Sequence, residues 1–78
     1  MNSTEKLVYM ANQIARNFGT MSDVDAGAAV ADHIAHFWDP RMKMMIFAHI
    51  DAGGDGLVPV ALIALRQLQA GAGQAPAA

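Results

Sequence analysis

The sequence predicts an all-α fold, a small bundle of about four short helices in one domain. Apolar residues recur at spacings of three and four along most of the chain, and no segment alternates with the period of a strand. Ser, Asp, Pro and Gly stand where such helices would begin and end. We expect a polar lead at residues 1–3, a helical domain at 4–69 and a flexible Gly/Ala/Pro tail at 70–78.

The first predicted helix covers residues 4–18. One face carries the apolar residues Leu7, Ala11, Ile14 and Phe18, and Tyr9 lies on the polar side with Lys6 and Arg16. Gly19 follows as a stop signal. This pattern is typical of an ordinary amphipathic helix.

The second predicted helix starts after Ser22, whose side chain suits an N-cap, and ends at about Trp38. On a helical wheel one face carries Val24, Ala28, Ala31, Ala35 and Trp38. We expect the alanines of this face to let a neighbouring helix, the first one, approach closely. A second apolar line holds Val30, Ile34 and Phe37, so this helix is predicted to have two neighbours.

A sharp elbow is predicted between the second and third helices. Proline disfavours the α conformation in the preceding residue, so Asp39 is pushed toward the extended angles that an N-cap needs, and Pro40 suits the first helical position. The third helix then follows at once. Trp38 at this corner has two interpretations that are compatible: it is the largest core residue, or it joins Phe37 and Arg41 at a partner interface, where Trp and Arg are enriched.

The third predicted helix, residues 40–52, is apolar almost all round, which is typical of a helix that is buried on every side. Gly53 and the glycines after it end that helix. A fourth helix is predicted from about Val58 to Leu68. Its core face holds Leu57, Ala61, Ala64, Leu65 and Leu68, while Ile63 points away.

Composition indicates a chain that hides part of its surface against another molecule. It is 54% hydrophobic and only 15% charged, whereas a small free monomer normally carries more charge on its surface. A chain of this length buries only about 60% of its unfolded surface by itself. The predicted partner interface is Tyr9, Phe37, Trp38, Arg41, Met44, Phe47 and Ile63.

Several classes of function are disfavoured by the same sequence. The net charge of −2 and five dispersed Lys and Arg residues argue against a nucleic-acid binder. No apolar run approaches the roughly 20 residues of a membrane span. The absence of Cys suits a reducing compartment, and we expect a cytoplasmic protein.

No catalytic, cofactor-binding or metal-binding residues are predicted. Asp32 and His36 share a helix face, but a catalytic zinc site needs three convergent ligands, and the sequence around His33, His36 and His49 does not frame one. The Ser and Thr residues lie at helix starts or in a loop, where capping explains them. The glycine-rich turn at residues 53–56 lacks the Lys-Ser/Thr of a phosphate-binding loop.

Two strings of residues carry a resemblance to a known family. Met10-Ala11-Asn12-Gln13-Ile14 and Phe37-Trp38-Asp39-Pro40-Arg41-Met42, with Val30-Ala31-Asp32-His33-Ile34 between them, are similar to the delta subunit of bacterial NAD-dependent, molybdenum-containing formate dehydrogenases. The resemblance covers about residues 5–68. It implies a non-catalytic accessory subunit that stabilises the large molybdenum subunit or helps it retain cofactor.

The resemblance also implies where the redox groups of such a complex lie. The large subunit would carry a bis-molybdopterin guanine dinucleotide centre and iron–sulfur clusters, and other subunits would carry further clusters, FMN and the NAD site. Two other functions stay open from the residues alone. One is a self-associating helical module, and the other is a helix-turn-helix DNA binder, which the two basic residues Arg41 and Lys43 of the third helix support poorly.

Overall fold

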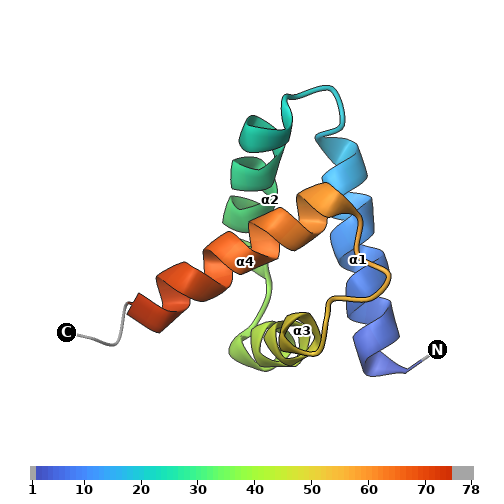
Figure 1. Cartoon of the computed structure of the whole chain (residues 1–78), viewed down its shortest axis with the longest axis vertical. Coiled ribbons are helices and arrows are strands. Elements are labelled where there is room, and N and C mark those ends of the chain that lie inside the picture. The colour runs from blue at the N-terminus through green and yellow to red at the C-terminus, as the bar shows by residue number, and fades with distance from the viewer. Residues whose placement is uncertain (1, 75–78) are drawn as a thin grey trace.

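Four helices form the fold of the computed structural model, which describes residues 2–74 (Figure 1). They are α1 (Ser3–Asn17), α2 (Asp23–Phe37), α3 (Pro40–Asp51) and α4 (Pro59–Gln74). A short turn joins α1 to α2, α3 lies at the other end of this pair, and α4 crosses over them to contact all three other helices. The predicted all-α bundle is confirmed, with no strand among residues 2–74.

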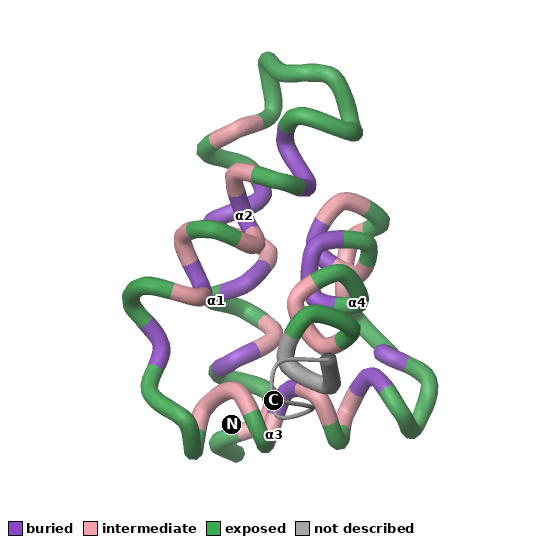
Figure 2. Tube along the Cα trace, turned by 90° about the vertical axis from the view of Figure 1, so that its left-hand side faces the viewer, coloured by how far each residue is buried: buried purple, intermediate pink, exposed green. Residues whose placement is uncertain are grey.

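All four helices contribute side chains to one core, and buried positions recur along each of them (Figure 2). On α1 and α4 these positions lie on the predicted faces. Half-buried side chains such as Phe18, Met42 and Leu68 pack around the outside of this core. The buried cluster consists of Leu7, Ala11, Ile14, Ala15, Val30, Ile34, Trp38, Ile46, Ile50, Ala61, Ala64 and Leu65.

Helix α1 begins one residue earlier than predicted, because residues 2 and 5 form a capping box. The Glu5 amide donates to Asn2 Oδ1 at 2.8 Å, and the Asn2 amide donates to Glu5 Oε1 at 3.3 Å. Two amides that the first turn leaves unpaired are satisfied in this way. Most of the predicted polar lead therefore belongs to the helix and its cap.

The buried face of α2 matches the predicted apolar lines only in part. Val30 and Ile34 of the second line are buried, together with Ala26 and Gly27. Val24, predicted on the first line, is 76% exposed. The main neighbour of α2 is α4 rather than α1. A Cβ added to Gly27 would lie 3.6 Å from Ile63 Cγ2, so small residues on α2 meet α4 at close range.

The elbow between α2 and α3 consists of two extended residues. Trp38 (φ −93°, ψ 137°) caps the end of α2, and Asp39 (φ −77°, ψ 168°) is the N-cap of α3. Asp39 Oδ1 accepts from the Met42 amide at 2.8 Å, and Pro40 opens the helix. A cap of the same kind starts α2, where Ser22 Oγ accepts from the Asp25 amide at 3.2 Å.

Replacing Asp39 by Ala is expected to lower the free energy of unfolding by about 1 kcal/mol, because the Met42 amide loses its acceptor. Asp39→Ser keeps an acceptor oxygen and should retain most of the stability. Urea unfolding followed by circular dichroism measures both variants. Equal losses in the two variants would contradict a capping role for Asp39.

Glycines end α3 in a Schellman arrangement. The Gly53 amide donates to the Ile50 carbonyl and the Gly54 amide to the His49 carbonyl, both at 2.9 Å. Gly53 (φ 121°) and Gly54 (φ 69°) lie in the left-handed region, where a Cβ is disfavoured. At Gly54 a Cβ would also lie 2.8 Å from Leu62 Cδ1, so the turn packs directly against α4.

Helix α4 runs six residues beyond the predicted end at Leu68, to Gln74. Residues 70–74, which we expected to lack structure, are therefore helical, and residues 75–78 lie outside the described part of the chain. Alanine and glutamine in this stretch favour the helix and its two glycines disfavour it, but extending an existing helix costs far less than nucleating a new one. Composition alone was a poor guide to this end of the helix.

Candidate partner-binding surface

Two aromatic neighbours in the sequence, Phe37 and Trp38, have opposite environments. Trp38 is 5% exposed and belongs to the core, whereas Phe37 is 72% exposed. Phe37 is the last residue of α2. Trp38 follows in an extended conformation, so its side chain leaves the helical face of Phe37 and is buried in the core. Of the two predicted interface aromatics at the elbow, only Phe37 lies at the surface, and Trp38 belongs to the core as one of its two interpretations predicted.

A shallow hollow of about 400 Å³ lies beside Phe37, between α2 and the end of α1. Its lining combines aromatic, small and titratable side chains. The rings of Phe37 and His33 lie 4.6 Å apart between centroids with a 32° tilt, so Phe37 rests against α2 itself. The residues that line this hollow are Phe18, Ala29, Asp32, His33, His36 and Phe37.

A second hollow, of about 390 Å³, lies on the other side of α2, against α4. It is lined mainly by small residues of α2 and by the outer side of α4. Asp32 borders both hollows, so the exposed line of α2 that carries it forms a ridge between them. The lining of this second hollow is Ala28, Ala31, Asp32, Ala35, Gln67, Leu68 and Gly71.

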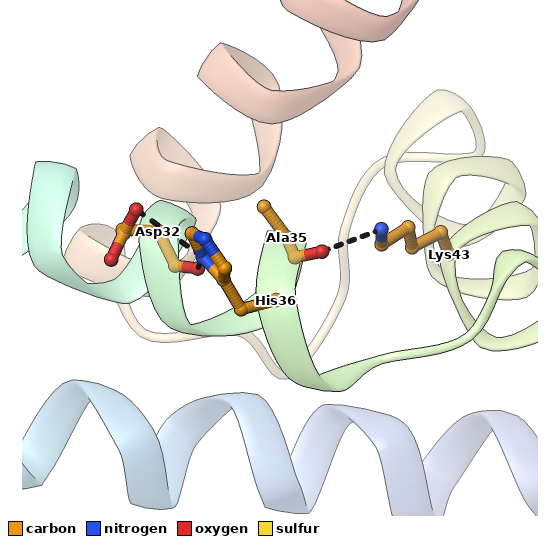
Figure 3. A network of polar contacts seen from close by, with 4 residues as sticks. All are labelled: Asp32, Ala35, His36 and Lys43. Carbon is orange, nitrogen blue, oxygen red and sulfur yellow. Dashed lines mark hydrogen bonds and ion pairs between the residues drawn. The ribbon is translucent and has the colours of Figure 1, made fainter.

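Polar contacts at the end of α2 fix the ridge and the elbow (Figure 3). The His36 ring donates through Nδ1 to the Asp32 carbonyl at 2.8 Å and lies 3.4 Å from Asp32 Oδ1. On the other side Lys43 Nζ of α3 donates to the Ala35 carbonyl at 2.9 Å. Because Ala35 is in the last turn of α2, this cation satisfies a carbonyl at the negative end of the helix dipole.

The other predicted interface residues are distributed over three helices. Met44 of α3 is 71% exposed, and Tyr9, Arg41 and Ile63 are also exposed. Phe47 is half-buried against the core and so offers less of its ring to a partner than predicted. Sequence reasoning missed three exposed apolar side chains, Met10, Met21 and Val24.

Asn12 links α1 to the loop before α4, a structural role that the sequence analysis did not predict. Its Nδ2 donates to the Gly56 carbonyl and its Oδ1 accepts from the Val58 amide, both at 2.9 Å. These bonds tie α1 to the loop before α4 across more than 40 residues of sequence. The only advance signal was the place of Asn12 within the Met-Ala-Asn-Gln-Ile string.

A cleft of about 580 Å³ lies beside this tie, between α1 and the loop. At one edge His49 donates through Nε2 to the Asp55 carbonyl at 2.7 Å. Its lining residues are Asn2, Thr4, Glu5, Val8, Tyr9, Asn12, His49, Asp55 and Gly56. Nowhere in residues 2–74 do three His, Asp or Glu side chains gather as a metal site would require.

Comparison with known families identifies the chain. Residues 6–65 match the family model described as NADH-dependent formate dehydrogenase delta subunit FdsD. The chain belongs to the FdsD family. The match begins within α1 and ends within α4, so it takes in the Asn12 tie, the ridge of α2 and the elbow.

Membership of the FdsD family makes this chain a delta subunit of an NAD-dependent formate dehydrogenase complex, as the resemblance implied. No curated protein and no solved structure matches the chain. Within residues 2–74 of this FdsD chain, no helix is long and apolar enough to cross a membrane.

Proposed function

We propose that this chain is a non-catalytic accessory subunit that binds the large molybdenum-containing subunit of formate dehydrogenase and stabilises its assembled state. Family membership supports a place in the complex. The exposed side chains of Phe37, before the elbow, and Met44, in α3 after it, supply a means of binding. The other subunits of the complex would be contacted only indirectly.

The observation that carries this proposal is the exposure of Phe37 and Met44 beside a core that is already complete. Trp38, Ile46 and Ile50 fill the interior on this side, so neither exposed side chain is needed to close it. Phe37 also lines a hollow, and large apolar side chains left exposed at such a place are typical of protein–protein contacts. Met44 adds a flexible side chain that adapts to a partner surface.

Stabilisation would follow from mass action. A subunit that binds only the folded partner shifts the folding equilibrium by RT ln(1 + [L]/Kd), about 2.7 kcal/mol at a hundredfold excess over Kd. The same linkage would favour a cofactor-loaded partner over an empty one if the chain binds the loaded form more tightly. No reaction step needs to be carried by the chain itself.

Redox groups belong to the partners in this proposal. The large subunit would hold a bis-molybdopterin guanine dinucleotide centre and iron–sulfur clusters, and other subunits would hold FMN and the NAD site. The 78 residues contain no cysteine, so they supply no thiolate ligand to an iron–sulfur cluster. The role proposed for the chain is therefore structural support of these centres.

Co-expression with the other formate dehydrogenase subunits tests the proposal. Changing Phe37 and Met44 together to Gln should weaken binding at least about tenfold, because each removes an apolar contact that the partner covers. Met10→Gln is the matched control, since Met10 is an exposed α1 residue outside the predicted interface. Size-exclusion chromatography of the purified complex reports the loss.

A second measurement addresses the consequence of binding. The enzyme purified without the chain should show a lower melting temperature and less bound molybdenum per large subunit than the complete complex. A chain that never co-elutes with the enzyme, or an enzyme with the same stability and metal content in its absence, would contradict the proposal.

A further inference from the structure

We infer that the hollow beside Phe37 docks onto a basic surface of the partner subunit, whose Lys or Arg side chains pair with Asp32 on α2. The inference rests on the proposed function and adds the chemistry of the partner's surface. It follows from the charges around the exposed face of α2.

The only formally charged residues of α2 are carboxylates. From Asp23 to Phe37 the helix holds three aspartates and no Lys or Arg. Asp23 and Asp25 lie in the first turn, where negative charge stabilises the helix dipole. Asp32 lies in the middle of the helix, where aspartate is a poor helix former and has no capping role.

Asp32 also has no strong cationic partner within the described part of the chain. Its one ion-pair contact there is with His36 at 3.4 Å, and the side chains of Asp32 and His36 are 75% and 68% exposed. Five Lys and Arg residues are present, but they belong to α1, α3 and α4. The Asp32 carboxylate therefore lies between the two hollows with no Lys or Arg side chain in ion-pair contact with it.

Any partner that fills the Phe37 hollow reaches the Asp32 carboxylate, because Asp32 lines it. Covering a carboxylate that has no Lys or Arg beside it with an apolar surface is strongly unfavourable, so we expect the partner to supply a cation there. Two copies of this chain meeting through the same face would instead bring their two Asp32 carboxylates together, and α2 has no Lys or Arg to offset them. The charge pattern thus favours a basic partner surface over a symmetric dimer.

Charge substitutions at Asp32 test this inference in the complete complex. We expect Asp32→Asn to weaken binding about tenfold and Asp32→Lys about a hundredfold, mostly through slower association. The salt dependence of the association rate should also become shallower in Asp32→Asn. The association and dissociation rates are measured by biolayer interferometry, with enzyme that lacks the delta subunit immobilised and each purified variant added in solution.

Asp55→Asn and Asp55→Lys are the matched controls, because Asp55 is an exposed aspartate in the loop between α3 and α4. They make the same charge changes away from α2 and should bind like the wild type. Circular dichroism should show unchanged helix content in the Asp32 variants, whose exposed side chain contributes nothing to the core.

The outcomes separate this inference from the proposed function. If the wild type binds and the Asp32 variants bind equally well, the basic surface is wrong and the accessory role stands. If the wild type does not bind the enzyme, both fail. Self-association of the chain that Asp32→Lys abolishes, with no binding to the enzyme, would assign the face to a second copy and overturn the inference.

Discussion

Replacing Trp38 by Ala is expected to unfold most of the isolated chain at 25 °C. Trp38 is 5% exposed and packs in the core at the junction of α2 and α3. Removing a buried aromatic side chain of this size costs about 3–5 kcal/mol. A domain of this length rarely has more than about 3–5 kcal/mol of stability to lose.

The neighbouring residue supplies the control for this experiment. Phe37→Ala also removes an aromatic ring, but Phe37 is exposed, and its loss should change the free energy of unfolding by only about 0.5 kcal/mol. Far-UV circular dichroism during urea unfolding measures both variants without relying on Trp fluorescence. Comparable losses at the two positions would show that Trp38 is not the core residue of the elbow.

Asn12→Ala is expected to lower the free energy of unfolding by about 2 kcal/mol. Both hydrogen bonds between α1 and the loop before α4 are lost, and the half-buried Val58 amide is left without its acceptor. Thermal unfolding should show the same order of effect as urea unfolding. Asn17→Ala, at the exposed end of α1, is the control and should be close to neutral.

A second variant separates the contribution of the Asn12 hydrogen bonds from the effect of a smaller side chain. Asn12→Asp keeps the acceptor for the Val58 amide but faces the Gly56 carbonyl with a carboxylate oxygen instead of a donor. We therefore expect it to be destabilised despite its equal size. Wild-type stability in Asn12→Asp would mean that the bond to Gly56 contributes nothing.

The local signals in the sequence predicted where most helices begin and end. Ser22 and Asp39 each accept an amide three residues ahead, and Gly53 allows the turn that ends α3. Such caps act within a few residues, so they can be recognised without knowing the fold. The capping box of Asn2 and Glu5 is equally local, although it was not among the predicted caps.

The candidate surface was predictable only in part. The apolar surplus pointed to exposed side chains, and Phe37, Met44 and Ile63 are indeed exposed. The division of Phe37 and Trp38 between surface and core could not be predicted, because it depends on which neighbouring helices the end of α2 meets. The exposure of Val24 has the same cause, since helical periodicity gives the faces of a helix but not the neighbour that each face meets.

The sequence by itself therefore determined the helical class, most of the helix boundaries and the likeness to the delta-subunit family, since all of these are written in short-range patterns. Only the tertiary structure decided that α4 packs against α2, that Asn12 holds a loop more than 40 residues away, and that Asp32 borders two hollows. Contacts between distant segments depend on how whole helices pack, and that packing is a property of the assembled core.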